Sequence, residues 1–260
     1  MITKCNNNER SLIMTKKFSK LIIILSFVLI LAACSGGNEG GNSEFELGDP
    51  IASVNGVTLH EGPYERAVER ILLGYQQQGI TLDGENGETV KERVHKQILD
   101  QMIQIEVLTQ EAQNLGFTPT DSEVQAELDS FKGQYGSDEE YNNALSENLF
   151  TEEEFRKIIF EDISVKTLFD EVVADVSVTE EEVEDYYLEI VQEAQQQLDA
   201  LRADGQELTQ EQIAMMAPPF FEEVQEDIYN QLMQQKTQEK QMEYVNKLME
   251  DSEIEMLIEE

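Results

Sequence analysis

The sequence predicts an all-α fold of several helices, with a long helix near the C-terminus and at most one short strand near the N-terminus. Apolar residues recur at three- and four-residue spacing through most of the chain, which is the spacing of one helix face. Helix-start signals are frequent. A strand pattern followed by a turn signal occurs once, in Ile51-Ala52-Ser53-Val54 followed by Asn55-Gly56.

Two helices are expected after this strand. The first runs from about Glu61 to Gln78, and Pro63 is tolerated because it lies in the first turn. The second has apolar residues from Val90 to Ala112 along one face, and Gly116 is placed to end it.

Five later segments begin with Ser or Thr followed three residues on by Glu or Gln, which is the capping-box pattern. They start at Thr120, Ser137, Thr151, Thr179 and Thr209. Because the box bonds the amides that a helix start leaves without partners, each of these residues is predicted to begin a helix.

The last helix is expected to run from about Phe220 to Asp251, after Pro218-Pro219. Its apolar residues cluster at its two ends, whereas its centre, residues 234–241, is polar. This pattern is typical of a helix that joins two packed regions.

The N-terminus has the layout of an exported lipoprotein. Lysines precede an apolar run from Leu21 to Ala33, which is too short to span a bilayer and fits a signal peptide. The run ends in Leu31-Ala32-Ala33-Cys34, which resembles a bacterial lipobox. That resemblance implies cleavage before Cys34, a diacylglycerol group on its thiol and an N-acyl chain on the new N-terminus. An ordinary signal peptide with a chance cysteine is the alternative.

The chain is therefore expected to have three parts. Residues 1–33 form a signal peptide, 34–49 a lipidated flexible tether rich in Gly, Ser and Asn, and 50–260 a helical body with two lobes. Either Met1 or Met14 serves as the start. The protein is expected at the outer face of the cytoplasmic membrane, anchored by lipid and not spanning the bilayer.

Composition narrows the possible partners. The chain has 18 Lys and Arg against 54 Asp and Glu, a net charge of −36, and loss of residues 1–33 would leave −40. Such a surface repels nucleic acid and anionic lipid, so no nucleic-acid partner is expected. Adaptation to salt or alkaline medium is the preferred explanation for most of this charge, and cation binding or attraction to basic, unfolded export substrates is the lesser alternative. Cys5 and Cys34 are the only cysteines, so the processed chain has no disulfide.

The sequence gives little support for catalysis, metal binding or a cofactor other than the lipid. His60 and His95 are the only histidines, and neither is accompanied by a nucleophile, so a solvent-facing or capping role is preferred. Acidic triplets begin at Asp138, Glu152 and Glu180. Each triplet follows a predicted helix start, where carboxylates favour the helix dipole.

Apolar residues around Pro218-Pro219 are the candidate substrate-binding group: Met215, Met216, Phe220 and Phe221. Methionine adapts its shape, so Met-rich surfaces suit binding to varied peptides. The rival interpretation places these side chains in the core.

In order, these motifs resemble the SurA N-terminal domain, as found in PrsA-like foldase lipoproteins. The resemblance rests on Val54-Asn55-Gly56, the helix 98–116, Thr151 to Lys157, the stretch 178–187 with Tyr186-Tyr187, and Pro219 to Lys236. In PrsA-like proteins a parvulin-type prolyl isomerase domain follows the Tyr-Tyr helix. Here about 195–218 stands in that place, which is too short for such a domain, and the His-containing motifs are missing.

The resemblance implies a chaperone that binds unfolded or partly folded exported proteins without catalysis. Two alternatives stay open: a prolyl isomerase, by analogy with relatives, and an adaptor lipoprotein of the cell envelope with one dedicated partner. Neither the clients nor the oligomeric state follows from the sequence.

Overall fold

The computed structural model describes residues 47–203 and 208–258 of the 260-residue chain. Within these residues it has eight helices and three short strands. In chain order they are β1 (Pro50–Val54), β2 (Val57–His60), α1 (Glu61–Gln77), α2 (Gly84–Asn114), α3 (Asp121–Lys132), α4 (Asp138–Glu147), α5 (Glu152–Val172), α6 (Glu180–Ala203), α7 (Gln210–Met216), α8 (Phe221–Asp251) and β3 (Ile254–Met256). The predicted, mainly α-helical class is confirmed.

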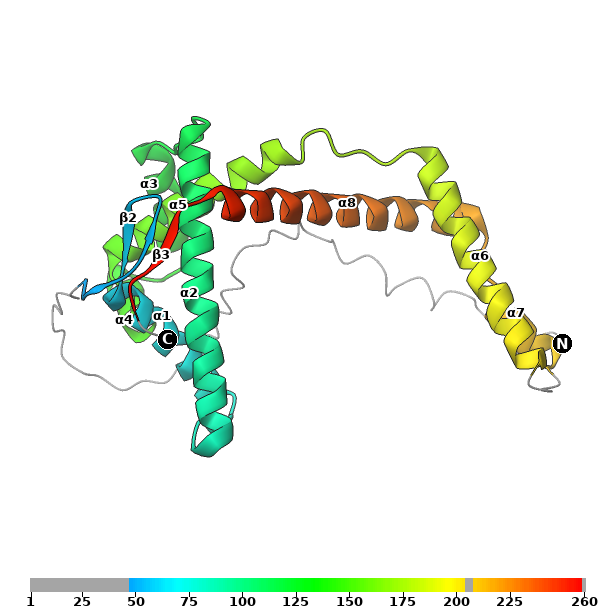
Figure 1. Ribbon diagram of the computed structural model, residues 1–260, viewed down its shortest axis with the longest axis horizontal. Helices are drawn as coiled ribbons and strands as arrows, with labels where there is room; N and C mark the ends of the chain where they lie inside the picture. The colour runs from blue at the N-terminus through cyan, green and yellow to red at the C-terminus, as the bar shows by residue number, and fades with distance from the viewer. Residues whose placement is uncertain (1–46, 204–207, 259–260) are drawn as a thin grey trace. The chain divides into compact units, whose positions relative to one another are not determined.

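The strand count differs from the prediction of at most one strand. The three strands form one antiparallel sheet in the order β2-β1-β3 (Figure 1). The turn signal was correct, since Asn55 and Gly56 join β1 to β2 with φ values of +50° and +84°. These positive values are those of the two-residue hairpin turns that Asn-Gly favours. The strands β2 and β3 were missed because four and three residues are too few to show a period-two pattern.

Asn55 also fixes the place of β3. Its amide nitrogen donates to the Glu253 carbonyl over 2.8 Å, and its side-chain oxygen accepts from the Glu253 amide, also over 2.8 Å. Its side-chain nitrogen donates to Gln110 of α2 over 2.9 Å. The hairpin turn therefore joins the sheet to α2 and to the end of the chain's last helix.

Buried apolar residues form three clusters. The first lies between the sheet, α1 and α2, with Ile51, Val54, Val68 and Ile103 among its members. The second joins α3, α4 and the start of α5 and includes Leu128, Tyr141 and Ile159. The third contains Leu108 and Ala112 of α2 and Leu168 of α5, with Val245 and Leu248 of α8 packed against them.

Helix α8 joins two packed regions, as the distribution of its apolar residues predicts. Its C-terminal half packs on α2 and α5 through Tyr244, Val245 and Leu248, and its N-terminal half packs on α6 (Figure 1). With 31 residues it spans roughly 46 Å at the usual rise per residue. The expected return of the last helix to the early helices is thus confirmed.

Helix starts agree closely with the predicted capping boxes. The side chains of Thr120, Thr151 and Thr209 each accept from the backbone amide three residues on, and their own amides donate to the Glu or Gln side chain at that position. Thr179 makes the same pair of bonds with Glu182. Ser137 differs, because the Glu140 carboxylate accepts from the Gly136 amide and only the Ser137 half of the box forms.

Candidate functional site

The candidate surface lies where α7 turns into α8. Thr209 begins α7 with its capping box, and the Ala217 amide donates to the Ile213 carbonyl over 3.1 Å at the other end. Pro218 and Pro219 then separate the two helices, since proline lacks the amide needed to continue α7. Phe220 occupies the position before the first residue of α8. We call residues 215–221 the α7–α8 turn.

The four predicted substrate-binding residues divide into two pairs. Met215 is 73% exposed and Phe220 is 74% exposed. Met216 and Phe221 are half-buried. The predicted group therefore presents two apolar side chains to solvent and turns two inward.

The turn is held against α6 by Tyr187. The Tyr187 hydroxyl donates to the Pro219 carbonyl over 2.9 Å. The Tyr187 and Phe221 rings meet edge to face, with their centroids 5.2 Å apart. Because both the backbone and a neighbouring ring are fixed in this way, Met215 and Phe220 are exposed from an ordered turn.

The packing of α6 on α8 uses few buried residues. Val183 and Leu198 of α6 and Ile228 of α8 are the buried members of these two helices within the part of the chain that is described. Polar contacts add to them: Lys236 pairs with Glu182 and donates to the Ser177 carbonyl over 3.0 Å, and Lys240 pairs with Asp175.

The two carboxylates of these ion pairs titrate below their usual range. The hydrogen bond from Lys236, with one from the Thr179 amide, lowers the pKa of Glu182 from its ordinary 4.5. The hydrogen bond from Lys240 lowers the pKa of Asp175 from its ordinary 3.8. Both carboxylates are therefore charged at neutral pH.

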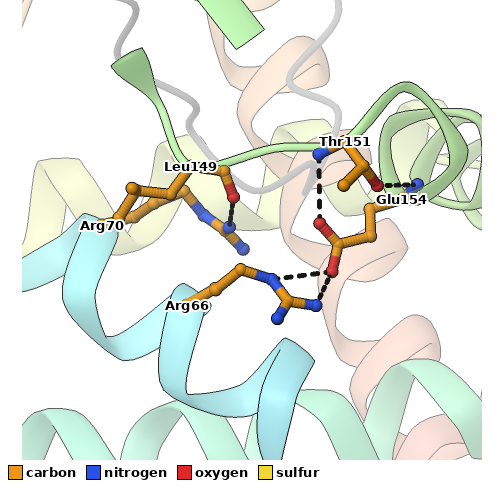
Figure 2. Close-up of polar contacts among 5 residues, drawn as sticks. All are labelled: Arg66, Arg70, Leu149, Thr151 and Glu154. Atoms are coloured by element: carbon orange, nitrogen blue, oxygen red, sulfur yellow. Dashed lines mark hydrogen bonds and ion pairs between the residues drawn. The ribbon is translucent and has the colours of Figure 1, made fainter. Parts of the chain in front are cut away.

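A second polar site joins α1 to the junction between α4 and α5 (Figure 2). Arg66 donates through Nε to Glu154 over 2.9 Å, and its Nη2 pairs with the same oxygen. The other Glu154 oxygen accepts from the Thr151 amide over 3.2 Å, so one carboxylate caps α5 and holds α1. Arg70 donates to the Leu149 carbonyl over 3.1 Å.

Arg70 is also stacked on an aromatic ring. Its guanidinium carbon lies 3.9 Å from the centre of the Phe150 ring. Burial lowers the pKa of Arg70 to about 10, with Glu154 opposing the shift and Arg66 adding to it. The guanidinium therefore stays charged at neutral pH, and the Arg66–Glu154 site is a structural joint between the first and second apolar clusters.

The two histidines have local structural contacts. His60 occupies the position before α1 but makes no capping bond there, and its Nδ1 lies 3.2 Å from the Gly48 carbonyl. His95 is not simply solvent-facing, because its Nδ1 lies 2.7 Å from the Tyr64 hydroxyl. Contacts of this kind orient side chains in a core and do not by themselves indicate a catalytic pair.

The acidic triplets occupy the first turns of α4, α5 and α6, as predicted. In the residues with described positions, no group of three or more His, Cys, Asp or Glu side chains is placed to hold a metal ion. Over the same residues, no helix combines the length and the apolar character that crossing a bilayer requires. Cys34 and residues 1–46 lie outside the described part of the chain, so the structure does not bear on the predicted lipidation.

Residues 47–49, at the end of the predicted tether, contact the start of α1. The Glu61 amide donates to the Asp49 carbonyl over 2.9 Å, and the Gly62 amide donates to the Leu47 carbonyl over 2.7 Å. These bonds satisfy amides that the first turn of α1 leaves without partners inside the helix.

The sequence matches the SurA-like N-terminal domain family over residues 1–169, which is more than half of the chain. The chain therefore belongs to the SurA-like N-terminal domain family. This confirms the family predicted from the order of the motifs.

Several curated relatives carry the name Foldase protein PrsA. The protein from Clostridium botulinum strain 657 is 26% identical over 185 residues, covering 67% of this chain and 54% of the relative. Its counterpart from strain Hall is 28% identical over the same coverage. The protein from Caldanaerobacter subterraneus subsp. tengcongensis is 25% identical over 225 residues, 85% of this chain and 62% of the relative. The chain thus spans about half the length of the Clostridium relatives.

Proposed function

We propose that this protein binds unfolded or partly folded exported chains at the α7–α8 turn and holds them without catalysis until they fold. The observation that carries the proposal is the exposure of Met215 and Phe220, at 73% and 74%, from an ordered turn. Membership of a chaperone-like family supports it.

The exposure of this pair is informative because the turn holds it in place. Single exposed apolar side chains are common on protein surfaces and need no explanation. Here the backbone between the two residues contains Pro218-Pro219 and is held by the contacts of Tyr187 with Pro219 and Phe221, which favours a preorganised surface for an apolar partner. Methionine and phenylalanine offer adaptable and aromatic contacts, which suit partners of varied sequence.

The proposal includes an address at the membrane. The signal-like N-terminus and the lipobox-like Leu31 to Cys34 support cleavage before Cys34 and lipidation of its thiol by diacylglycerol, with an N-acyl chain on its amine. An anchor at the outer face of the cytoplasmic membrane would place the folded body where exported chains emerge. Mass spectrometry of Cys34 in membranes from the producing cell tests this directly, and an unmodified thiol would contradict it.

The non-catalytic part of the proposal rests on the connection between α6 and α8. Over its described residues this connection contains only the seven-residue α7 and has no histidine. The resemblance to PrsA-like proteins, together with the relatives that carry that name, makes a prolyl isomerase the second candidate. An isomerisation assay on a proline peptide separates the two, and proline-directed catalysis would overturn the holding function.

The decisive experiment changes the exposed pair. For the double variant Met215→Ser and Phe220→Ser, we expect a rise of about tenfold in the concentration of this protein that is needed to protect a denatured client from aggregation. The reason is that a few apolar anchors carry most of the binding energy. The full chain in lipid nanodiscs is the sample. Leu115→Ser with Ile80→Ser is the matched control, because both residues are exposed and apolar but lie outside the α7–α8 turn.

Each outcome of this experiment has a meaning. Unchanged protection by the Met215 and Phe220 variant, with unchanged circular dichroism, would remove the turn as the binding surface. A change in oligomeric mass without a change in protection would assign the pair to self-association. A pull-down from membranes that recovers one stoichiometric protein, instead of many exported clients, would favour an adaptor.

A further inference from the structure

We infer that the α7–α8 turn selects segments of unfolded chains that combine apolar side chains with lysine or arginine. This inference rests on the proposed function and adds the charge of the segment that is bound. It is carried by the charged residues around the two exposed apolar side chains.

Acidic residues dominate the region that presents the turn. From Glu180 to Gln235 the sequence contains 15 acidic residues and one basic residue, Arg202. The ratio for the whole chain is 54 to 18, so this region is far more one-sided than the average. The excess is therefore a local feature and not only a property of the composition.

The acidic side chains nearest in sequence to the exposed pair are themselves exposed. Glu211 lies in the first turn of α7, and Glu222 and Glu223 lie in the first turn of α8. All three are exposed, and each lies within four residues of Met215 or Phe220 in the sequence. A bound segment would therefore meet apolar and negatively charged groups at one place.

The basic residues of α6 and of α8 as far as Lys240 are already paired. Arg202 donates to Asp199 over 3.2 Å, one helical turn away. Lys236 pairs with Glu182, and Lys240 pairs with Asp175. Their charges are offset by these partners, so the potential around the turn stays negative.

The exposed carboxylates around the α7–α8 turn favour binding of a positively charged segment. Charges of one sign raise the local concentration of opposite charges and speed their association. An exposed apolar pair alone makes a small contact area, so attraction from several carboxylates is a substantial part of the total. At about 0.1 M salt the attraction extends roughly 10 Å, which covers a few residues on either side of the apolar contact.

The same charges disfavour a second copy of this chain as the occupant. Two copies meeting at their α7–α8 turns would bring Glu211, Glu222 and Glu223 of each close to those of the other. Like charges at an interface oppose association. A cationic segment of an unfolded chain instead meets complementary charge.

The test uses three peptides of equal length with the same apolar positions and with Lys, Ser or Glu between them. Anisotropy is measured with the full chain in phosphatidylcholine nanodiscs, with empty nanodiscs as the blank. At low salt we expect the Lys peptide to bind about tenfold more tightly than the Ser peptide and the Glu peptide to bind least tightly. The Lys-to-Ser ratio should fall to about twofold at 0.5 M salt, because the carboxylates are exposed.

Two triple variants, each lacking three carboxylates, test whether the preference for the Lys peptide depends on the acids beside the α7–α8 turn. Glu211→Gln, Glu222→Gln and Glu223→Gln together should reduce the Lys-to-Ser ratio to about threefold at low salt. The control is Asp138→Asn, Glu139→Gln and Glu153→Gln, which removes three exposed first-turn acids from α4 and α5. This control should leave the ratio unchanged.

Different results would contradict client binding at the turn and selection of cationic segments. Equal binding of the Lys and Ser peptides above the blank would overturn charge selection and leave client binding at the turn intact. No binding of any peptide would overturn both. An equal loss of selectivity in the control variant would assign the effect to the overall charge of the chain and so overturn the role of the turn.

Discussion

Residues 50–172 and residues 180–235 are both mainly helical, but different contacts stabilise them. The first region has three apolar clusters whose central side chains, such as Leu128 and Leu168, are almost fully buried. In the second, Val183, Leu198 and Ile228 are the buried residues within its described part, and ion pairs and tyrosine hydrogen bonds add to them.

Under the proposed function, this difference would let one chain combine a stable body with a surface for transient contacts. A densely packed region leaves few large apolar groups free for partners, because packing inside the protein already uses them. A region with little internal packing can keep Met215 and Phe220 exposed while Tyr187 and Pro219 hold the backbone in place. Local stability of this kind is typical of segments that bind ligands.

The largest expected effect is on the third apolar cluster. Leu168→Ala, at a side chain that is 0% exposed, should lower the free energy of unfolding by about 3 kcal/mol, because it leaves a cavity between α2, α5 and α8. Ile228→Ala is the matched change in the other region. It should reduce hydrogen-exchange protection in α6 and the first half of α8 and leave α2 protected. Equal loss of protection throughout the chain from Ile228→Ala would show that the two regions unfold as one unit.

A smaller effect is expected at the joint between α1 and α5. Arg66 and Glu154 have side chains that are 12% and 21% exposed, so Arg66→Met should cost about 2 kcal/mol by leaving a partly buried carboxylate without its main cation. Urea denaturation measures the cost. The control is Arg202→Met, which breaks the Arg202–Asp199 pair, whose side chains are 52% and 61% exposed, and should cost about 0.3 kcal/mol. Equal costs would mean that the joint behaves as an ordinary surface ion pair.

The smallest expected effect is on the pH dependence of stability. The pKa shift of a carboxyl group in one region should have the opposite sign to that in the other. Because Lys236 lowers the pKa of Glu182, the contribution of that pair to stability is present above pH 4.5 and is lost as the pH falls through the lowered value. Burial raises the pKa of Glu161 in α5, so the cost of ionising Glu161 is relieved as the pH falls through that raised value.

Carbon-detected NMR titration of the two carboxyl groups measures both shifts. Lys236→Met should return the pKa of Glu182 toward 4.5 and leave that of Glu161 unchanged. Shifts of the same sign in the unmodified chain would remove this distinction between the regions.

Local signals predicted most of the helices. Thr151 with Glu154 and Thr209 with Gln212 are capping boxes in the structure as in the sequence, because the box involves residues only three apart. Residues 215–221 were candidates for exposure because they lie in the short connection that stands in place of an isomerase domain, but the inward packing of Phe221 was not predicted. That packing depends on Tyr187, a residue of another helix.

Contacts between distant residues were not predictable in this way. The Arg66–Glu154 pair joins residues 88 apart, and the Tyr64–His95 contact joins residues 31 apart. Neither pair has a spacing that a helix or hairpin period would pick out. The pairing of β3 with β1 was not predictable for the same reason, since β1 lies at the other end of the folded body.

The pairing of β3 with β1 has a consequence for the order in which the protein folds. Asn55 bonds to Glu253, 198 residues later, so the sheet gains its third strand only after residues 254–256 have been synthesised. Contacts of such long sequence separation form slowly, because closing the intervening loop costs entropy first. During synthesis the β1–β2 hairpin therefore has an open edge until residues 254–256 arrive. The edge of a strand that is synthesised early is thus covered only by a strand that is synthesised much later.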